Sequence, residues 1–199
     1  MAYLTLNPRR LALTTLLVIL FTGSMIWLHR DDAPLGYARY EKYGFSLSYP
    51  KLMSLREVGL SDMGLGPDPS DFSGLIQCQS LWENKLDVFE VIWFVKTKAP
   101  SAEAELLDFL RVASKAGSVV KSVGEYYVTT FRGRAMSCIN IEVEEAGYTF
   151  SGIIGVVYRP WTSPGVERTF FIAYLTFKGV ATEEQIHADL QTYMGGLSI

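Results

Sequence analysis

The residues from Leu11 to Leu28, LALTTLLVILFTGSMIWL, carry no charge, and this run constrains the chain more than any other feature of its sequence. About 18 apolar residues approach the length that a helix needs to cross a hydrocarbon core of about 30 Å. A single segment can cross only as a helix, because its backbone polar groups must be paired within the segment. No polar face interrupts the run, so a helix in the core of a globular domain is disfavoured.

The residues that flank this run indicate its orientation. Arg9 and Arg10 precede it, and Trp27 stands at its far end. Basic residues favour the cytoplasmic side, and tryptophan favours the membrane interface. A cleaved signal peptide is the alternative, but its apolar core is usually about 7–15 residues long and is followed by small residues. We therefore predict a single-pass protein of the cell membrane, with an uncleaved anchor over residues 1–30, a cytoplasmic N-terminus and an extracytoplasmic domain. The residues that represent this anchor are Leu11, Leu17, Phe21 and Trp27.

Residues 31–36, DDAPLG, have the composition of a linker, which leaves residues 37–199 for one domain. The apolar fraction of 49% and the charged fraction of 20% are ordinary for a globular protein. Eighteen basic and 21 acidic residues give a net charge of −3. A nucleic-acid-binding domain usually carries a basic patch, so we predict that nucleic acid is not a partner.

Alternation of apolar and polar residues predicts that the domain is rich in strands. Phe45–Tyr49 alternates with the period of a half-buried strand. Leu86–Lys96 is apolar almost throughout, which indicates a central strand with both faces covered. Ser61–Gly74 is dense in Gly, Pro, Asp and Ser and is predicted to be an irregular loop. Further strands are predicted over residues 75–82, 126–131, 135–144, 148–158 and 168–177.

Two helices are predicted beside these strands. The first begins at Ser101, a suitable N-cap, and has an apolar stripe with a period of three to four residues. The second begins at Thr182, which forms a capping box with Gln185. Each apolar stripe needs a sheet to cover. The predicted fold class is α+β: an antiparallel sheet with helices packed on its faces, an α/β/α sandwich, preceded by the transmembrane helix.

Two short signatures resemble the PsbP-like family of extrinsic proteins, named for a photosystem II subunit. Tyr43–Pro50, YGFSLSYP, is similar to the family's opening strand, and Gly133-Arg134-Ala135 similarly leads into a long meander. The resemblance covers about residues 37–199. It implies an α/β/α sandwich and a non-catalytic role in docking to, or assembling, a membrane complex.

The side chains that catalysis needs are scarce. His29 and His187 are the only histidines, and neither has a partner at metal-ligand spacing, so we predict no enzyme activity, no metal site and no cofactor. Glu142, Glu144 and Glu145 could bind a hard cation through their carboxylates. A solvated strand face is the alternative for these acids, and we favour it.

The two cysteines, Cys78 and Cys138, leave two interpretations open. They could form one disulfide in an oxidising compartment. Alternatively, both are small buried side chains, which is how free cysteine usually behaves.

Two loops are candidates for binding a partner. Arg159 and Trp161 belong to RPWTSPG, in which two prolines stiffen the loop around an aromatic side chain. Asp68 and Phe72 belong to the long loop before the strand at 75–82, and long irregular loops are often functional. A stiff loop with an exposed aromatic loses little entropy when it binds. The predicted partner-binding residues are Arg159, Trp161, Asp68 and Phe72.

The function predicted from these features is a membrane-anchored, extracytoplasmic, non-catalytic module that binds a protein partner at the membrane surface. The alternative is a domain that binds a small molecule or a metal ion in a pocket between a helix and the sheet. Trp93, Phe131 or Tyr174 would line that pocket. A hydrolase with a carboxylate pair is the third hypothesis, and no motif favours it.

Overall fold

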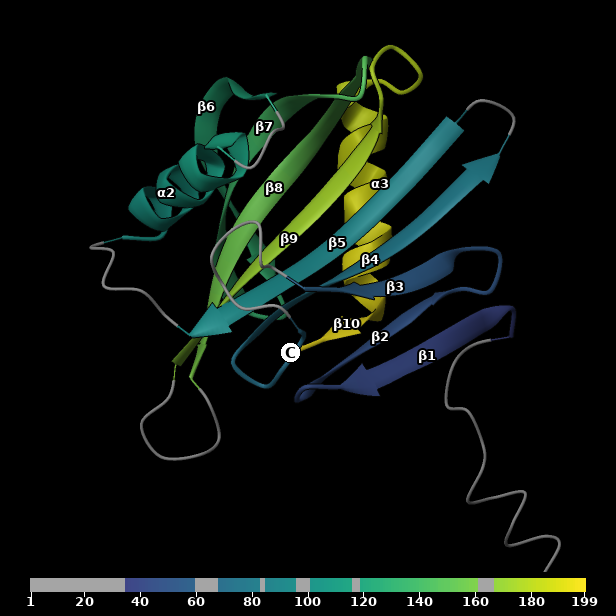
Figure 1. The fold of residues 1–199 in the computed structure, drawn as a ribbon, viewed down its shortest axis with the longest axis vertical. Coiled ribbons are helices and arrows are strands. Elements are labelled where there is room, and N and C mark those ends of the chain that lie inside the picture. The colour runs from purple at the N-terminus through teal and green to yellow at the C-terminus, as the bar shows by residue number, and fades with distance from the viewer. Residues whose placement is uncertain (1–34, 60–67, 83–84, 96–100, 116–118, 161–166) are drawn as a thin grey trace, which may run out of the picture.

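The computed structural model describes residues 35–59, 68–82, 85–95, 101–115, 119–160 and 167–199, and this part of the chain contains ten strands and two helices (Figure 1). The strands are β1 Tyr37–Lys42, β2 Phe45–Pro50, β3 Ser54–Val58, β4 Ser73–Trp82, β5 Lys85–Val95, β6 Val119–Phe131, β7 Arg134–Glu145, β8 Tyr148–Pro160, β9 Glu167–Phe177 and β10 Leu197–Ser198. The helices are α2 Ala102–Lys115 and α3 Glu183–Gly196.

The strands form two antiparallel sheets. The larger has seven strands in the order β3-β4-β5-β9-β8-β7-β6, and the smaller has three in the order β1-β2-β10. The predicted central strand is confirmed, because β5 lies inside the large sheet with β4 and β9 beside it. Its side chains are buried alternately on both faces, with Trp93 on one face and Ile92 and Phe94 on the other. This double burial explains why the strand is apolar almost without interruption.

Each face of the large sheet has its own core. On one face, α3 and the three-stranded sheet pack together, with Ile186, Leu190 and Met194 of the helix buried against the strands. On the other face, α2 covers β6 and β8 (Figure 1). Phe109 of this helix stacks on Phe171, with ring centroids 4.3 Å apart. The large sheet therefore separates two apolar layers of different construction.

Both predicted helix starts are confirmed. The backbone N–H of Gln185 donates to Thr182 Oγ1 at 3.3 Å, and the N–H of Thr182 donates to Gln185 Oε1 at 2.9 Å. These reciprocal bonds are the capping box that the sequence indicates. At the other helix, the N–H of Ala104 donates to Ser101 Oγ at 3.1 Å.

The predicted fold class needs a correction. The described part of the chain is mostly β, with ten strands and only two helices, and it is not an α/β/α sandwich. On the side of α3, much of the covering layer is the three-stranded sheet, which the sequence analysis did not foresee. The physical reason is the width of the large sheet. Its seven strands form a surface wider than the area that a single helix of 14 residues can cover.

The predicted membrane protein is corrected as well. None of the helices in the described ranges combines the length and the apolarity that crossing a bilayer requires. Both α2 and α3 have 14 residues and carry acids in their first turns. The structure therefore gives no support to a single N-terminal membrane helix or to a single-pass location in the cell membrane. The anchor residues Leu11, Leu17, Phe21 and Trp27 lie outside the described residues.

Gly152 of β8 provides a test of the sheet register. A Cβ atom at this position would lie 2.0 Å from the carbonyl oxygen of Tyr174 on β9. We expect Gly152→Ala to lower the free energy of unfolding by about 1–3 kcal/mol, because two paired strands must separate to admit the methyl group. Urea denaturation of the full-length protein measures the change.

Gly195→Ala is the matched control for this substitution. A Cβ atom at Gly195 meets nothing within 4 Å, and the residue lies in α3. Alanine there should leave the stability unchanged or raise it by up to about 1 kcal/mol. Equal effects of the two substitutions would contradict the close approach of β8 and β9.

Candidate functional site

The strands that flank the two loops predicted to bind a partner lie next to one another at one end of the large sheet. Ser73 at the start of β4 pairs with Phe94, Val95 pairs with Arg168, and Arg168 pairs with Arg159. The start of β4, the end of β5, the start of β9 and the end of β8 therefore lie side by side (Figure 1). We call this region the strand-end site and define it by Asp68, Asp71, Phe72, Val95 and Arg168.

The predicted binding residues differ in what the structure describes. Asp68 and Phe72 are both exposed. The backbone of Arg159 belongs to β8, where it pairs with Arg168, and its side chain is not described. Trp161 lies outside the described residues. The structure thus brings Phe72 and the backbone of Arg159 to the same end of the sheet.

A tight turn holds Phe72 in place. The side chain of Phe72 is 63% exposed, yet its N–H donates to Ser70 Oγ at 3.2 Å. The N–H of Ser73 donates to the same oxygen at 3.3 Å, and the N–H of Ser70 donates to the carbonyl of Ser73 at 2.8 Å. The aromatic ring is therefore presented to solvent by an ordered backbone.

Trp93 lies beneath this turn and anchors it. Its indole N–H donates to the carbonyl of Ser70 at 2.7 Å, and its side chain is fully buried. The ring contacts Tyr43 and Phe45, each with centroids 5.1 Å away. Gly74 lies against the same ring, because an added Cβ would come within 2.4 Å of it. The sequence showed Trp93 as one apolar residue among many and gave no sign of this anchoring role.

Charged groups border the exposed ring. Arg168 is only 1% exposed, and its guanidinium donates to the carbonyl oxygen of Tyr43. Asp71 lies 3.9 Å from that guanidinium and is 64% exposed. Asp68 adds a second exposed carboxylate, and Val95 adds an apolar side chain that is 43% exposed. The surface combines an apolar centre with an acidic border.

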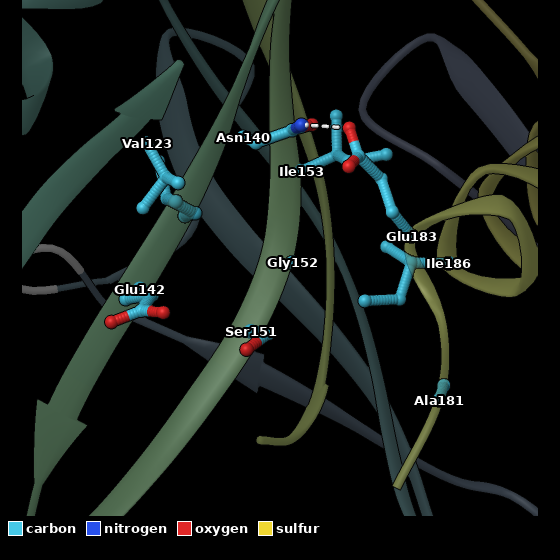
Figure 2. Close-up of a pocket in the computed structure, with 10 residues that line it drawn as sticks. Val123, Asn140, Glu142, Ser151, Gly152, Ile153, Ala181, Glu183 and Ile186 are labelled. Carbon is cyan, nitrogen blue, oxygen red and sulfur yellow. Dashed lines mark hydrogen bonds between the residues drawn. The ribbon is translucent and has the colours of Figure 1, made fainter. Parts of the chain in front are cut away.

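A second candidate is a small cavity where α3 begins (Figure 2). Its volume is about 170 Å³, below the range of about 300–1,000 Å³ that is usual for ligand pockets. Figure 2 shows Asn140 donating a hydrogen bond to Glu183 beside Ile153. Apolar side chains of Val123 and Ile186 complete the walls. The size of this cavity fits a few water molecules better than an organic ligand.

Two of the three glutamates considered as cation ligands are engaged in ion pairs. Glu142 lies 2.7 Å from Lys178, and Glu144 lies 2.6 Å from Lys121. The hydrogen bond from Lys121 holds the pKa of Glu144 below its ordinary value. Among the residues that the structure describes, no group of three or more His, Cys, Asp or Glu side chains is placed to hold a metal ion. These ion pairs fit the alternative interpretation, in which the glutamates belong to a solvated strand face.

The two cysteines are free and buried, so the possible disulfide is ruled out in this structure. Cys78 belongs to β4 and Cys138 to β7, which are four strand spacings apart in the sheet. Four spacings amount to roughly 19 Å. A disulfide requires Cα atoms within about 7 Å of each other.

The residues proposed to line a pocket between helix and sheet are packed in the core. Trp93, Phe131 and Tyr174 all belong to the apolar layer beneath α3 and the small sheet. His187 is half-buried, with its ring 5.3 Å from that of Tyr127 and its Nε2 3.9 Å from Glu183.

The hydroxyl of Ser70 provides a test of the turn at the strand-end site. We expect Ser70→Ala to cost about 1 kcal/mol of stability, since two backbone N–H groups lose their acceptor. Hydrogen exchange at Phe72 and Ser73 should become faster. Ser54→Ala is the control. The hydroxyl of Ser54, on the edge strand β3, donates to the carbonyl of Gln79 and lies outside the turn. Unchanged exchange in Ser70→Ala would show that the hydroxyl does not hold the turn.

The thiols provide a further test. Burial raises the pKa of Cys78 and of Cys138 to about 12, so both are protonated and shielded at pH 8. We expect a thiol-specific disulfide reagent to modify neither cysteine in the native protein and both after unfolding in denaturant. An intact mass lower by two hydrogens under non-reducing conditions would instead reveal a disulfide.

Comparisons with known proteins leave the family open. No protein-family model matches the chain, and no match is found among curated proteins. Among solved structures, the chain is similar to that of LpqN, a protein involved in cell envelope biogenesis of Mycobacterium tuberculosis. The sequence identity is 16% and the TM-score is 0.46, over 85% of this chain and 86% of that one.

Proposed function

We propose that the domain is a non-catalytic module that binds a protein partner through the strand-end site. The observation that carries the proposal is the position of Phe72, whose ring is 63% exposed on a turn fixed by Ser70 and Trp93. An exposed aromatic side chain on an ordered backbone is costly to leave in water, and little entropy is lost when it docks.

The surroundings of Phe72 support the same proposal. Phe72 directly precedes Ser73, and the pairing of Ser73 with Phe94 places Val95 beside Phe72. Both side chains are exposed, and we refer to the two together as the apolar centre of the site. Binding hot spots typically consist of such an aromatic anchor surrounded by residues that exclude water.

The acidic border defines the chemistry of the partner. Asp68 and Asp71 are exposed carboxylates next to the apolar centre. A matching protein surface would offer an apolar pocket for the ring of Phe72, with lysine or arginine side chains at its edge. Opposite charges at an interface mainly increase the association rate and the specificity.

A non-catalytic role is supported by the state of the reactive groups. Cys78 and Cys138 are buried as protonated thiols, which are poor nucleophiles. His187 contacts Tyr127 and Glu183 on the helix side of the sheet, away from the strand-end site. The resemblance to PsbP-like proteins, which implies docking rather than catalysis, agrees with this proposal.

Site-specific photo-crosslinking in the producing cells tests the proposal. A benzophenone amino acid at position 72 is expected to give a discrete crosslinked protein. The same amino acid at position 81 is the matched control, because Leu81 is 70% exposed at the other end of β4. Crosslinked adducts of equal intensity at both positions, or no adduct at position 72, would contradict the proposal.

The partner found in this way allows a quantitative test. We expect Phe72→Ala to weaken its binding about 30-fold, corresponding to the loss of about 2 kcal/mol that is typical of a hot spot. Leu81→Ala should leave the affinity within a factor of two. Binding that is insensitive to Phe72→Ala would place the interface elsewhere.

A further inference from the structure

A second cavity, of about 380 Å³, lies between the C-terminal half of α3 and the small sheet. It is at the opposite end of β1 from Lys42 and Tyr43, so it is remote from the strand-end site. Its volume is within the range of about 300–1,000 Å³ that is usual for small-molecule sites. The lining residues that matter here are Tyr37, Ser48, Asp189, Thr192, Tyr193 and Gly196.

Asp189 joins this cavity to a partly buried polar cluster. The hydroxyl of Tyr174 lies within hydrogen-bonding distance of two carboxylates, Asp189 Oδ2 at 2.9 Å and Asp87 Oδ1, which share its single proton. Lys85 Nζ lies 3.0 Å from Asp189 Oδ2 and 3.2 Å from Asp87 Oδ1. Two carboxylates and one ammonium give the cluster a net charge of −1. Its members come from β5, β9 and α3, so the charge is fixed in position by three separate elements.

The surroundings of Tyr174 and Lys85 set the protonation states of these two groups. Burial raises the pKa of Tyr174, and the two nearby carboxylates raise it further, so its hydroxyl remains a donor. Burial lowers the pKa of Lys85, but hydrogen bonds to Asp189 and Asp87 outweigh burial and raise the pKa overall. At neutral pH, Lys85 is therefore charged and Tyr174 is neutral. Lys85 thus contributes one positive charge and Tyr174 contributes none, so the formal net charge of the cluster stays at −1.

One oxygen of Asp189 is available to a ligand. Lys85 and Tyr174 both use Oδ2. Within the described ranges, Oδ1 has no hydrogen-bond partner, and the side chain of Asp189 is 34% exposed where it lines the cavity. A carboxylate oxygen in this position accepts hydrogen bonds most strongly from a charged donor.

Two further features of the cavity favour a cation. The first is the end of α3 at Gly196, where the helix dipole is negative and the last turn contains no basic residue. This end already attracts one cation, since Arg132 Nη2 donates to the carbonyl of Gly195 at 3.2 Å.

The second feature is aromatic. Tyr193 stacks on Phe89 and on Tyr174, with centroids 5.2 Å and 5.6 Å apart, so its ring is held in a fixed orientation. Tyr37 lines the cavity as well. Tyrosine rings attract ammonium groups through their faces and also pack against alkyl chains.

We propose that this cavity binds a small organic ammonium compound. The cationic head hydrogen-bonds to Asp189 Oδ1, and the hydrocarbon part lies against Tyr37 and Tyr193. Ser48 and Thr192 supply hydroxyl groups at the edge of the cavity. The site is separate from the strand-end site, so a small ligand and a protein partner could occupy the molecule together.

Titration of the full-length, ¹⁵N-labelled protein with n-butylammonium tests the proposal, and 1-butanol is the neutral probe of similar size. We expect n-butylammonium to shift the amide signals of Tyr193 and Gly196 at millimolar concentration, at constant ionic strength. We expect 1-butanol to shift them at least ten times less. Equal responses to the two probes, or no response to n-butylammonium, would overturn the proposal.

Three variants make the test specific. Asp189→Asn should weaken n-butylammonium binding at least ten-fold, and Glu184→Gln, which removes an exposed acid from the same helix, should have no effect. Tyr37→Leu leaves the polar cluster intact and should weaken binding about three-fold or more. This variant therefore still tests the proposal if Asp189→Asn unfolds. Unchanged affinity in Asp189→Asn or in Tyr37→Leu would contradict the proposed mode of binding.

Discussion

The indole of Trp93 is the contact on which the arrangement of the two sheets depends. It projects from the central strand β5 and packs against Tyr43 and Phe45 of the small sheet. The same ring fills the space above Gly74, and its N–H holds the carbonyl of Ser70. One side chain therefore fixes both the packing of the small sheet on the large one and the shape of the turn that presents Phe72. A buried indole needs a hydrogen-bond acceptor, and the turn supplies it.

The layer beneath α3 changes character along the strands. Near Trp93 it is aromatic and dry, whereas at the start of β5 it contains Asp87, Lys85 and the hydroxyl of Tyr174. Asp87, Lys85 and the hydroxyl of Tyr174 are tolerated in this layer because each of the three has a charged or hydrogen-bonded partner. Asp189 is the member of the cluster that also reaches a cavity. The two ends of one layer thus support two different surfaces, an apolar one with exposed Phe72 and a polar one with Asp189.

The sequence alone was sufficient for elements whose signal is local. The apolar run of β5, the strand at Phe45–Tyr49 and the capping box at Thr182 all depend on neighbouring residues, and the structure contains each of them. The beginning of β6 was missed, because Gly124 has φ +85° and a register shift follows Val123. Such a bulge breaks the alternation that identifies a strand.

Elements that depend on distant partners could not be predicted. The two residues of β10 are a strand only because Leu197 pairs with Leu47, from the other end of the chain. The strand-end site is similar in this respect. Loop composition pointed to Phe72 and Arg159, but their proximity follows from the pairing of Arg168 with both Val95 and Arg159. The burial of Arg168 also had no sequence signal, since arginine is rarely buried.

The width of the large sheet explains why two helices do not suffice to cover it. Seven strands span six spacings, or roughly 29 Å, whereas a helix is about 10–12 Å in diameter and 14 residues of helix are about 21 Å long. On the face of α3, the small sheet covers the remaining area. On the face of α2, the described part of the chain contains no second sheet. Strands β4 and β5 carry polar side chains on that face instead. Glu90 on β5 accepts a hydrogen bond from Gln77 on β4 at 2.7 Å, and burial raises its pKa. The hydrogen bond from Gln77 offsets the cost of burying this carboxyl group in a central strand, so the two faces of the large sheet are filled in different ways.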